Sequence, residues 1–259
     1  MKPDNTTSAG KVPEVTLIFW IIKIAATTLG ETGGDSVTMT LGFGYLAGTA
    51  LFAALLVLLI AAQIAAQRFN RWLYWATIIA STTAGTTLAD FADRSLGIGY
   101  AGGASVLFAA LLATLAAWYW SLGTIAVESV RAPKAEAFYW LAITLSQTLG
   151  TALGDWTADD TGLGYTGGAL VFATGLAALA ALYAWTGVSR VFLFWAAFIL
   201  SRPLGATLGD FLDKPIADGG LAFSRPLASA VIGAFIIVCL IALPQRAGGH
   251  AEAGTGMEG

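Results

Sequence analysis

Four aspartates stand at the same distance from an aromatic-tryptophan pair in four stretches of the chain. The pairs are Phe19-Trp20, Tyr74-Trp75, Tyr139-Trp140 and Phe194-Trp195. Fifteen residues after each Trp come Asp35, Asp90, Asp155 and Asp210. Carboxylates of this kind can bind a hard cation or carry a proton. Asp also caps turns, and Arg94 and Lys214 follow two of these aspartates, so a purely structural role is the competing interpretation.

Polar residues form a stripe on the segment that precedes each aspartate. Positions seven, eleven and fifteen after the Trp share one helical face, because they are spaced four residues apart. Besides the aspartates, the stripe holds Thr27, Glu31, Thr82, Thr86, Gln147, Thr151, Arg202 and Ala206, with Lys23 one turn earlier. Lys23, Glu31, Gln147 and Arg202 break the repeated pattern. Charges inside a membrane commonly mark a pathway, whereas the competing interpretation is that Lys23, Glu31 and Arg202 form ion pairs between helices.

The residue types missing from these stretches argue against several kinds of chemistry. The single cysteine, Cys239, lies in an apolar run, and the single histidine, His250, lies in a Gly-rich tail. A copper site and a Ser-His nucleophile are therefore not expected. Gly42-x-Gly44 precedes a membrane-like run, so it does not indicate a phosphate loop. With a net charge of −3 and no basic run, nucleic acid is not expected either. We expect no enzyme activity and no cofactor apart from a transported cation.

The elements that must position these residues are long apolar segments. Hydrophobic residues make up 57% of the chain. A helix of about 20 consecutive, mainly apolar residues is long enough to cross a bilayer. Eight segments fit this length, at 15–28, 45–66, 72–88, 100–120, 138–153, 165–186, 191–208 and 221–243. Each aromatic-Trp unit holds two segments, joined in three copies by a Gly-x-Gly-Tyr turn. We predict an all-α integral membrane protein with about eight transmembrane helices, arranged as four tandem two-helix repeats in two pseudo-symmetric halves.

A polar linker separates the two halves. We expect an N-terminal tail over 1–12, a first half over 13–127, a linker over 128–136, a second half over 137–243 and a flexible tail over 244–259. The cations lie at the termini and between repeats, at Lys2, Lys11, Arg68, Arg71, Arg131, Lys134, Arg190 and Arg246. The positive-inside rule therefore predicts a multi-pass membrane protein with both termini in the cytoplasm.

Small and aromatic residues have structural roles in this interpretation. The residues ten and fourteen after each Trp are Gly or Ala, and such small-xxx-small spacing lets helices pack closely in lipid. Pro203, which follows Arg202, is a helix breaker that would free carbonyls in mid-helix. The aromatic-Trp pairs are expected to anchor helices at the membrane surface, as aromatic belts do.

These segments also resemble a known family. Lys11-Val12-Pro13-Glu14-Val15, the stretches 19–23 and 28–35 and the Gly-x-Gly-Tyr turns are similar to those of bacterial membrane proteins built from four copies of a "repeat of unknown function". The resemblance covers about residues 11–243. It implies a multi-pass membrane protein described only as membrane-anchored, and it implies very little about activity.

Transport of a hard cation is the function that the polar residues favour. Oxygen ligands without His or Cys suit manganese, magnesium, calcium, sodium or protons, and among these we favour efflux of a divalent metal such as manganese. The predicted metal ligands are Glu31, Asp35, Asp90, Asp155 and Asp210. The predicted pathway adds Lys23, Thr27, Gln147, Thr151 and Arg202. The alternatives are a non-transporting membrane partner or regulatory subunit and, third, a membrane-embedded enzyme. The expected partners are the lipid bilayer and a small cation, and a homodimer is compatible with the sequence.

Overall fold

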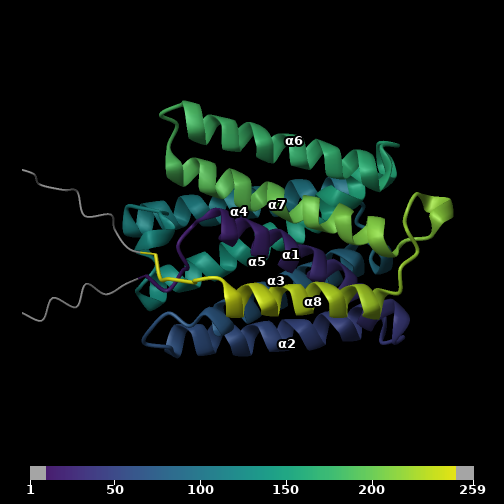
Figure 1. Ribbon diagram of the computed structural model, residues 1–259, viewed down its shortest axis with the longest axis horizontal. Helices are drawn as coiled ribbons and strands as arrows, with labels where there is room; N and C mark the ends of the chain where they lie inside the picture. Colours follow the sequence, from purple (N-terminus) through teal and green to yellow (C-terminus); the bar gives the residue numbers. More distant parts are fainter. Residues whose placement is uncertain (1–9, 249–259) are drawn as a thin grey trace, which may run out of the picture.

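The computed structural model describes residues 10–248, which fold into eight α-helices that run roughly side by side (Figure 1). The helices are α1 (Leu17–Asp35), α2 (Gly44–Ala65), α3 (Arg71–Asp90), α4 (Tyr100–Leu122), α5 (Pro133–Asp155), α6 (Gly164–Trp185), α7 (Arg190–Asp213) and α8 (Arg225–Ala242). Between residues 10 and 248 the chain has no strand, only an isolated bridge between Pro13 and Ala247. The all-α prediction is confirmed. Most of both predicted tails, with Lys2 and His250, lies outside the described residues.

The first three repeats turn with the same local structure. A π-helical turn follows the aspartate directly, at Ser36–Thr40, Phe91–Ser95 and Trp156–Asp160. Two glycines with positive φ complete each turn, as Gly42 at 74° and Gly44 at 75° do in the first repeat. Glycine adopts this conformation without steric cost, which accounts for the Gly-x-Gly motif. The fourth repeat lacks the motif, and there α7 continues to Asp213 before a 3-10 turn at Ile216–Asp218.

The linker between the halves is shorter than expected. The prediction placed it over 128–136, but α5 already begins at Pro133, a residue suited to the first turn of a helix. Glu136, in that first turn, is buried and lies 2.7 Å from Lys11 Nζ. The polar residues that suggested a loop are therefore partly a helix start held by an ion pair.

The first helices of the four repeats, α1, α3, α5 and α7, form a closed inner ring. On each inner helix, the glycine ten residues after the Trp lies against the next inner helix. The residue that it contacts there is seven residues after the Trp of that next helix. A Cβ added at Gly85 would lie 2.9 Å from the backbone of Gln147. The other pairs are Gly30 with Thr82, Gly150 with Arg202 and Gly205 with Thr27. The last pair returns α7 to α1, so close helix packing by small residues is confirmed.

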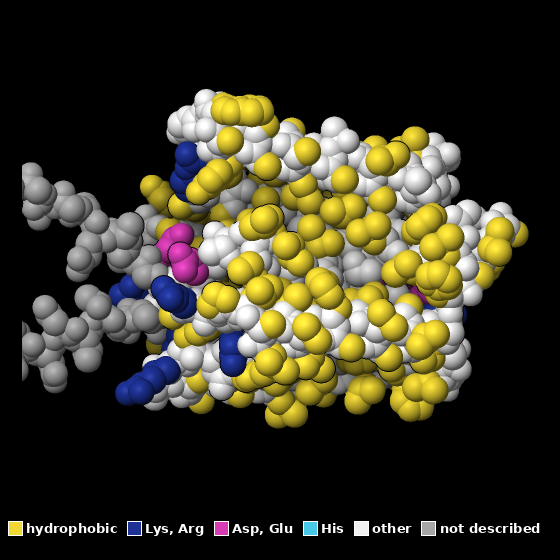
Figure 2. Space-filling view, in the orientation of Figure 1, with side chains coloured by type: hydrophobic (Ala, Val, Ile, Leu, Met, Phe, Trp, Pro, Cys, Tyr) yellow, Lys and Arg dark blue, Asp and Glu magenta, His cyan; other side chains and the backbone are white. Residues whose placement is uncertain are grey.

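The second helices of the repeats form an outer layer around this ring. Each packs against the first helix of the following repeat: α2 on α3, α4 on α5, α6 on α7, and α8 on α1. Their outward faces are covered with hydrophobic side chains (Figure 2). Five helices, α2, α4, α6, α7 and α8, are long and apolar enough to cross a membrane. The inner helices α1, α3 and α5 are less apolar, because they carry the polar stripe inside the ring.

The tryptophans of the aromatic-Trp pairs lie within the helix bundle. Trp75, Trp140 and Trp195 are only 0%, 3% and 4% exposed. Each packs edge to face against the aromatic residue before it. An interfacial anchor places its ring among lipid headgroups, so the anchoring prediction is wrong for these three residues. Their role is core packing.

The residues that precede these tryptophans close the inner ring at one end. Tyr74 and Tyr139 lie with their hydroxyl oxygens 2.6 Å apart, and the rings of Phe19 and Phe194 lie 6.2 Å apart. All four side chains are buried. We call these four residues the aromatic layer.

The two ends of the described chain meet at the aromatic end of the bundle. Gly10 N donates to Gly248 O at 3.0 Å, and Glu14 N donates to Arg246 O at 2.9 Å. Figure 2 shows Lys and Arg side chains gathered at this end, on the left of the view. We call it the basic end. The four aspartates lie toward the opposite end.

Candidate cation site

Arg202 points from α7 into the centre of the inner ring and is fully buried. Its Nη2 donates to Glu31 Oε2 at 3.0 Å, to Thr86 Oγ1 at 2.6 Å and to Thr151 Oγ1. These three acceptors are the residues eleven positions after the Trp on α1, α3 and α5. The equivalent residue of α7 is Ala206, which lies one turn after Arg202. One guanidinium nitrogen thus links all four inner helices. Pro203 does not interrupt α7.

Three carboxylates from three repeats meet next to Arg202. Glu31, Asp155 and Asp210 each offer an oxygen, and these oxygens lie within 4.8 Å of one another. The three side chains are 3%, 4% and 4% exposed. Hard divalent cations hold oxygen ligands at about 2.0–2.6 Å, so oxygens around one ion lie within about 5 Å of each other. We call Glu31, Asp155 and Asp210 the axial carboxylate cluster.

A second carboxylate group shares Asp210 and is neutralised by Lys214. Oxygens of Asp35, Asp210 and Asp213 also lie within 4.8 Å of one another. Lys214 Nζ lies 2.9 Å from Asp35 and 3.0 Å from Asp210. Arg225 adds a second cation, 3.3 Å from Asp213 and 3.7 Å from Asp35. Burial opposes the charge of the ammonium, but the carboxylates of Asp210, Asp35 and Asp213 raise the pKa of Lys214 above its usual value. This second group is therefore an ion-pair network.

Asp90 and Asp155 occupy equivalent positions but differ in their counter-ions. Arg94 follows Asp90 by four residues, and its Nε lies 2.9 Å from Asp90 Oδ1. Asp159 follows Asp155 by the same four residues, so an acid takes the place of the arginine, and Asp159 is exposed. Among residues 10–248, no Lys or Arg nitrogen lies within 4.0 Å of Asp155. Asp155 is thus a buried repeated aspartate without an ion pair, and it belongs to the axial carboxylate cluster.

The structure brings together part of the predicted ligand set. Glu31, Asp155 and Asp210 form one group, and Asp35 joins Asp210 in the other. Asp90 belongs to neither group, and its ion pair gives it the structural role that was the competing interpretation.

The other predicted pathway residues also lie inside the ring. Lys23, Thr27, Gln147, Thr151 and Arg202 are all 0% exposed. The hypothesis of an ion pair between helices is confirmed for Arg202 and Glu31. It is wrong for Lys23, which has no carboxylate oxygen within 4.0 Å in the described part of the chain.

Two residues of the acidic region were not predicted as part of the site. Asp213 belongs to the Asp-Phe-x-Asp-Arg/Lys motif shared by the second and fourth repeats, so the motif itself was an available signal. Arg225 begins α8 and reaches Asp213 across a turn. No sequence pattern specified that contact, since the fourth repeat departs from the others at this turn.

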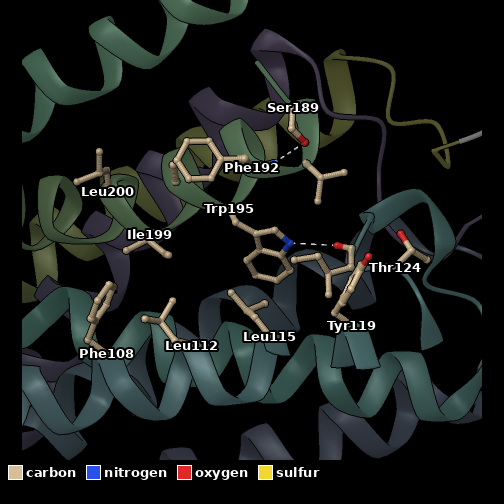
Figure 3. Close-up of a pocket in the computed structure, with 13 residues that line it drawn as sticks. Phe108, Leu112, Leu115, Tyr119, Thr124, Ser189, Phe192, Trp195, Ile199 and Leu200 are labelled. Atoms are coloured by element: carbon tan, nitrogen blue, oxygen red, sulfur yellow. Dashed lines mark hydrogen bonds between the residues drawn. The ribbon is translucent and has the colours of Figure 1, made fainter. Parts of the chain in front are cut away.

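A separate groove at the surface has no charged side chain in its lining. It lies between α4 and α7, with a volume of about 650 Å³ (Figure 3). Phe108, Leu112, Phe192 and other apolar side chains line it, and no charged residue does. Trp195 Nε1 donates to Ile125 O at 3.1 Å along its wall. The groove suits an apolar occupant such as lipid.

The four-repeat architecture agrees with a comparison of the chain with known families. The family model described as Repeat of Unknown Function (DUF347) matches residues 18–69, 73–124, 138–189 and 193–244. The chain belongs to this family. Each DUF347 match contains one inner helix and one outer helix, so the repeat of the family is the two-helix unit of the fold. Comparisons with curated proteins and with solved structures find no match for this DUF347 chain.

Proposed function

We propose that this DUF347 protein transports a hard cation along the axis of the inner ring. The observation that carries the proposal is the axial carboxylate cluster, whose member Asp155 has no cation within 4.0 Å in residues 10–248. A buried carboxylate without a counter-ion costs several kcal/mol in a membrane. A bound cation would remove that cost, and carboxylate and hydroxyl oxygens would replace its water.

The same proposal has all eight helices crossing the bilayer. The outer helices and α7 are apolar enough to do so by composition. The inner helices α1, α3 and α5 are as long, and the outer helices surround them, so their polar side chains need not face lipid. Cations gathered at the basic end support a cytoplasmic location of that end in a bacterial inner membrane.

Among hard cations, we propose manganese as the substrate and export as the direction. The axial carboxylate cluster offers oxygen ligands only, which suits manganese, magnesium or calcium better than copper. Thr86 and Thr151 add hydroxyl oxygens at the level of Glu31. The uptake experiment below separates these ions from one another.

Passage along the axis requires two groups to move. Arg202 occupies the centre of the ring and holds Glu31 by a 3.0 Å ion pair. The aromatic layer closes the basic end, with Tyr74 and Tyr139 in contact. We propose that cation binding at Asp155 competes with Arg202 for Glu31, and that release of the arginine opens the axis.

The experiment is metal uptake into liposomes that contain the purified chain. Manganese, magnesium, calcium, zinc, sodium and protons are compared for the native chain, Asp155→Asn and Asp160→Asn. Asp160 is exposed and lies outside the cluster, so its variant is the matched control. We expect uptake of one divalent ion, reduced at least about tenfold by Asp155→Asn, equivalent to about 1.4 kcal/mol. If the protein exports the ion from the cytoplasm, then the molecules that carry it into the liposome are those inserted with the basic end on the outside.

Two results would count against transport. Absence of uptake for every ion by the folded chain would favour a non-transporting membrane partner. Uptake that Asp155→Asn leaves unchanged would remove the axial carboxylate cluster from the path.

A further inference from the structure

Lys23 is a fully buried lysine whose contacts in residues 10–248 include no carboxylate. It points from α1 into the inner ring and is 0% exposed. Its Nζ donates to Ser201 Oγ at 3.3 Å and lies 4.0 Å from the centre of the Phe198 ring. In residues 10–248 no carboxylate oxygen lies within 4.0 Å of it. A buried ammonium normally has an anionic partner.

Arg202, on the same helix as Ser201, has N–H groups that donate no hydrogen bond. Ser201, which Lys23 contacts, directly precedes Arg202. Arg202 uses Nη2 for Glu31 and two threonines, but its buried Nε and Nη1 have no hydrogen-bond partner. The guanidinium therefore carries two further N–H donor groups without an acceptor.

Gln147 adds another unpartnered donor at the level of Arg202. It lies seven residues after Trp140, as Arg202 does after Trp195, and it is 0% exposed. Neither its Nε2 nor its Oε1 has a partner. Gly150, one turn along α5, packs against the Arg202 side chain. Buried amides in proteins are nearly always hydrogen-bonded, so this side chain has a donor and an acceptor free for a bound group.

We propose that Lys23, Arg202 and Gln147 bind a small anion on the aromatic side of the axial carboxylate cluster. The three side chains offer the charge of Arg202 and several N–H donors. Within residues 10–248, the carboxylate in contact with them is Glu31, which Arg202 Nη2 already holds. An ion of the size of chloride, nitrate or acetate accepts several such donors at once. The hydroxyl of Thr82, also buried without a partner, can donate to the same ion.

The inferred site places a negative charge on each side of Arg202. Glu31 holds the guanidinium from the acidic side, and the anion would hold it from the aromatic side. Anion binding would thus weaken the ion pair between Arg202 and Glu31 and leave Glu31 more available to a cation at the axial carboxylate cluster. The binding itself does not rest on cation transport, since it can be measured without any metal.

The experiment is anion binding to the purified, metal-free full chain. Radiolabelled chloride binding and the unfolding temperature are measured with chloride, nitrate or acetate, each against gluconate, which is too large for a site among packed side chains. A ligand that binds only the folded state raises the unfolding temperature. We expect saturable binding of one chloride per chain and a higher unfolding temperature in chloride than in gluconate.

Two variants and a control assign the binding to these residues. Lys23→Met should abolish chloride binding and the difference between chloride and gluconate, whereas Lys134→Met, at an exposed lysine, should keep both. If Lys23→Met does not fold, Gln147→Leu serves in its place and should weaken binding at least about tenfold. Absence of chloride, nitrate and acetate binding by the native chain overturns the proposal. So does binding that survives in a folded Lys23→Met chain. Either result leaves the metal-uptake experiment unaffected.

Discussion

The inner and outer helices of the repeats distribute their polar side chains in opposite ways. On the inner ring, the side chains of Lys23, Glu31 and Arg202 are 0%, 3% and 0% exposed. On the outer helices, Leu58 and Val106 are 68% and 70% exposed. A soluble protein has charged residues outside and apolar ones inside. The difference agrees with a membrane protein whose polar residues are arranged around an interior axis.

The repeat and the departures from it have separate consequences. Glycines at equivalent positions let four inner helices close into a ring, and no single repeat could do this alone. The departures from the repeat occur once each: Arg202 stands where other copies have Thr or Gln, and Asp159 stands where the second copy has Arg94. Symmetry therefore builds the scaffold and supplies the aspartates, and single substitutions make the copies of the candidate site differ.

The largest expected effect is a loss of stability when a buried arginine, rather than an exposed one, is replaced. Arg202→Leu should lower the free energy of unfolding by about 3–5 kcal/mol, because it leaves Glu31 buried without a partner. Arg190→Leu, at an exposed position that has no ion pair within the described residues, should cost less than about 1 kcal/mol. Unfolding of both variants in detergent micelles checks the contrast. Equal losses would contradict the assignment of Arg202 to the core of the ring.

A smaller effect is expected from a methyl group at a helix contact. Gly85→Ala places a Cβ 2.9 Å from the backbone of Gln147, and we expect a loss of about 1–3 kcal/mol. Gly102, on the outer helix α4, has nothing within 4 Å of an added Cβ. Gly102→Ala should stabilise the chain by about 0.5–1 kcal/mol. Unfolding midpoints of the two variants measure both changes. A stabilising Gly85→Ala would show that α3 and α5 do not pack closely at Gly85.

At Asp159 we expect mainly a change in binding. Asp159→Arg gives the third repeat the cation that the second repeat has in Arg94. We expect the arginine to pair with Asp155, to reduce manganese binding and to raise the free energy of unfolding, because the buried carboxylate gains a counter-ion. Asp160→Arg is the control for added charge. Manganese binding equal in native chain and Asp159→Arg would argue that Asp155 is not a ligand.

The helices and their pairing into repeats were predictable from the sequence. Spacing from each Trp to its glycine and aspartate recurs in every copy, and an apolar run marks each of the eight helices. The small-residue positions also predicted close helix contacts, and the Gly150 contact with Arg202 follows that expectation. These features are local, so one segment of sequence is enough to specify them.

Contacts between repeats were not predictable in the same way. Lys214 was expected to pair with Asp210 four residues earlier, but it also reaches Asp35 in the first repeat. The burial of Trp75 and Trp195 was missed because an aromatic pair near a helix end has the same spacing in a lipid-facing anchor and in a closed ring. Both outcomes depend on which helices lie inside, and that is decided by how four repeats close on one another.

Manganese binding to the purified native chain and to Asp155→Asn is the most direct test of the axial carboxylate cluster. Electron paramagnetic resonance of free manganese measures the bound fraction without requiring transport. We predict one saturable site in the native chain and its loss in Asp155→Asn, while Asp160→Asn binds as the native chain does. A native chain that binds no manganese, magnesium or calcium, or an Asp155→Asn chain that binds manganese as tightly as the native one, would contradict a cation site on the axis of the ring.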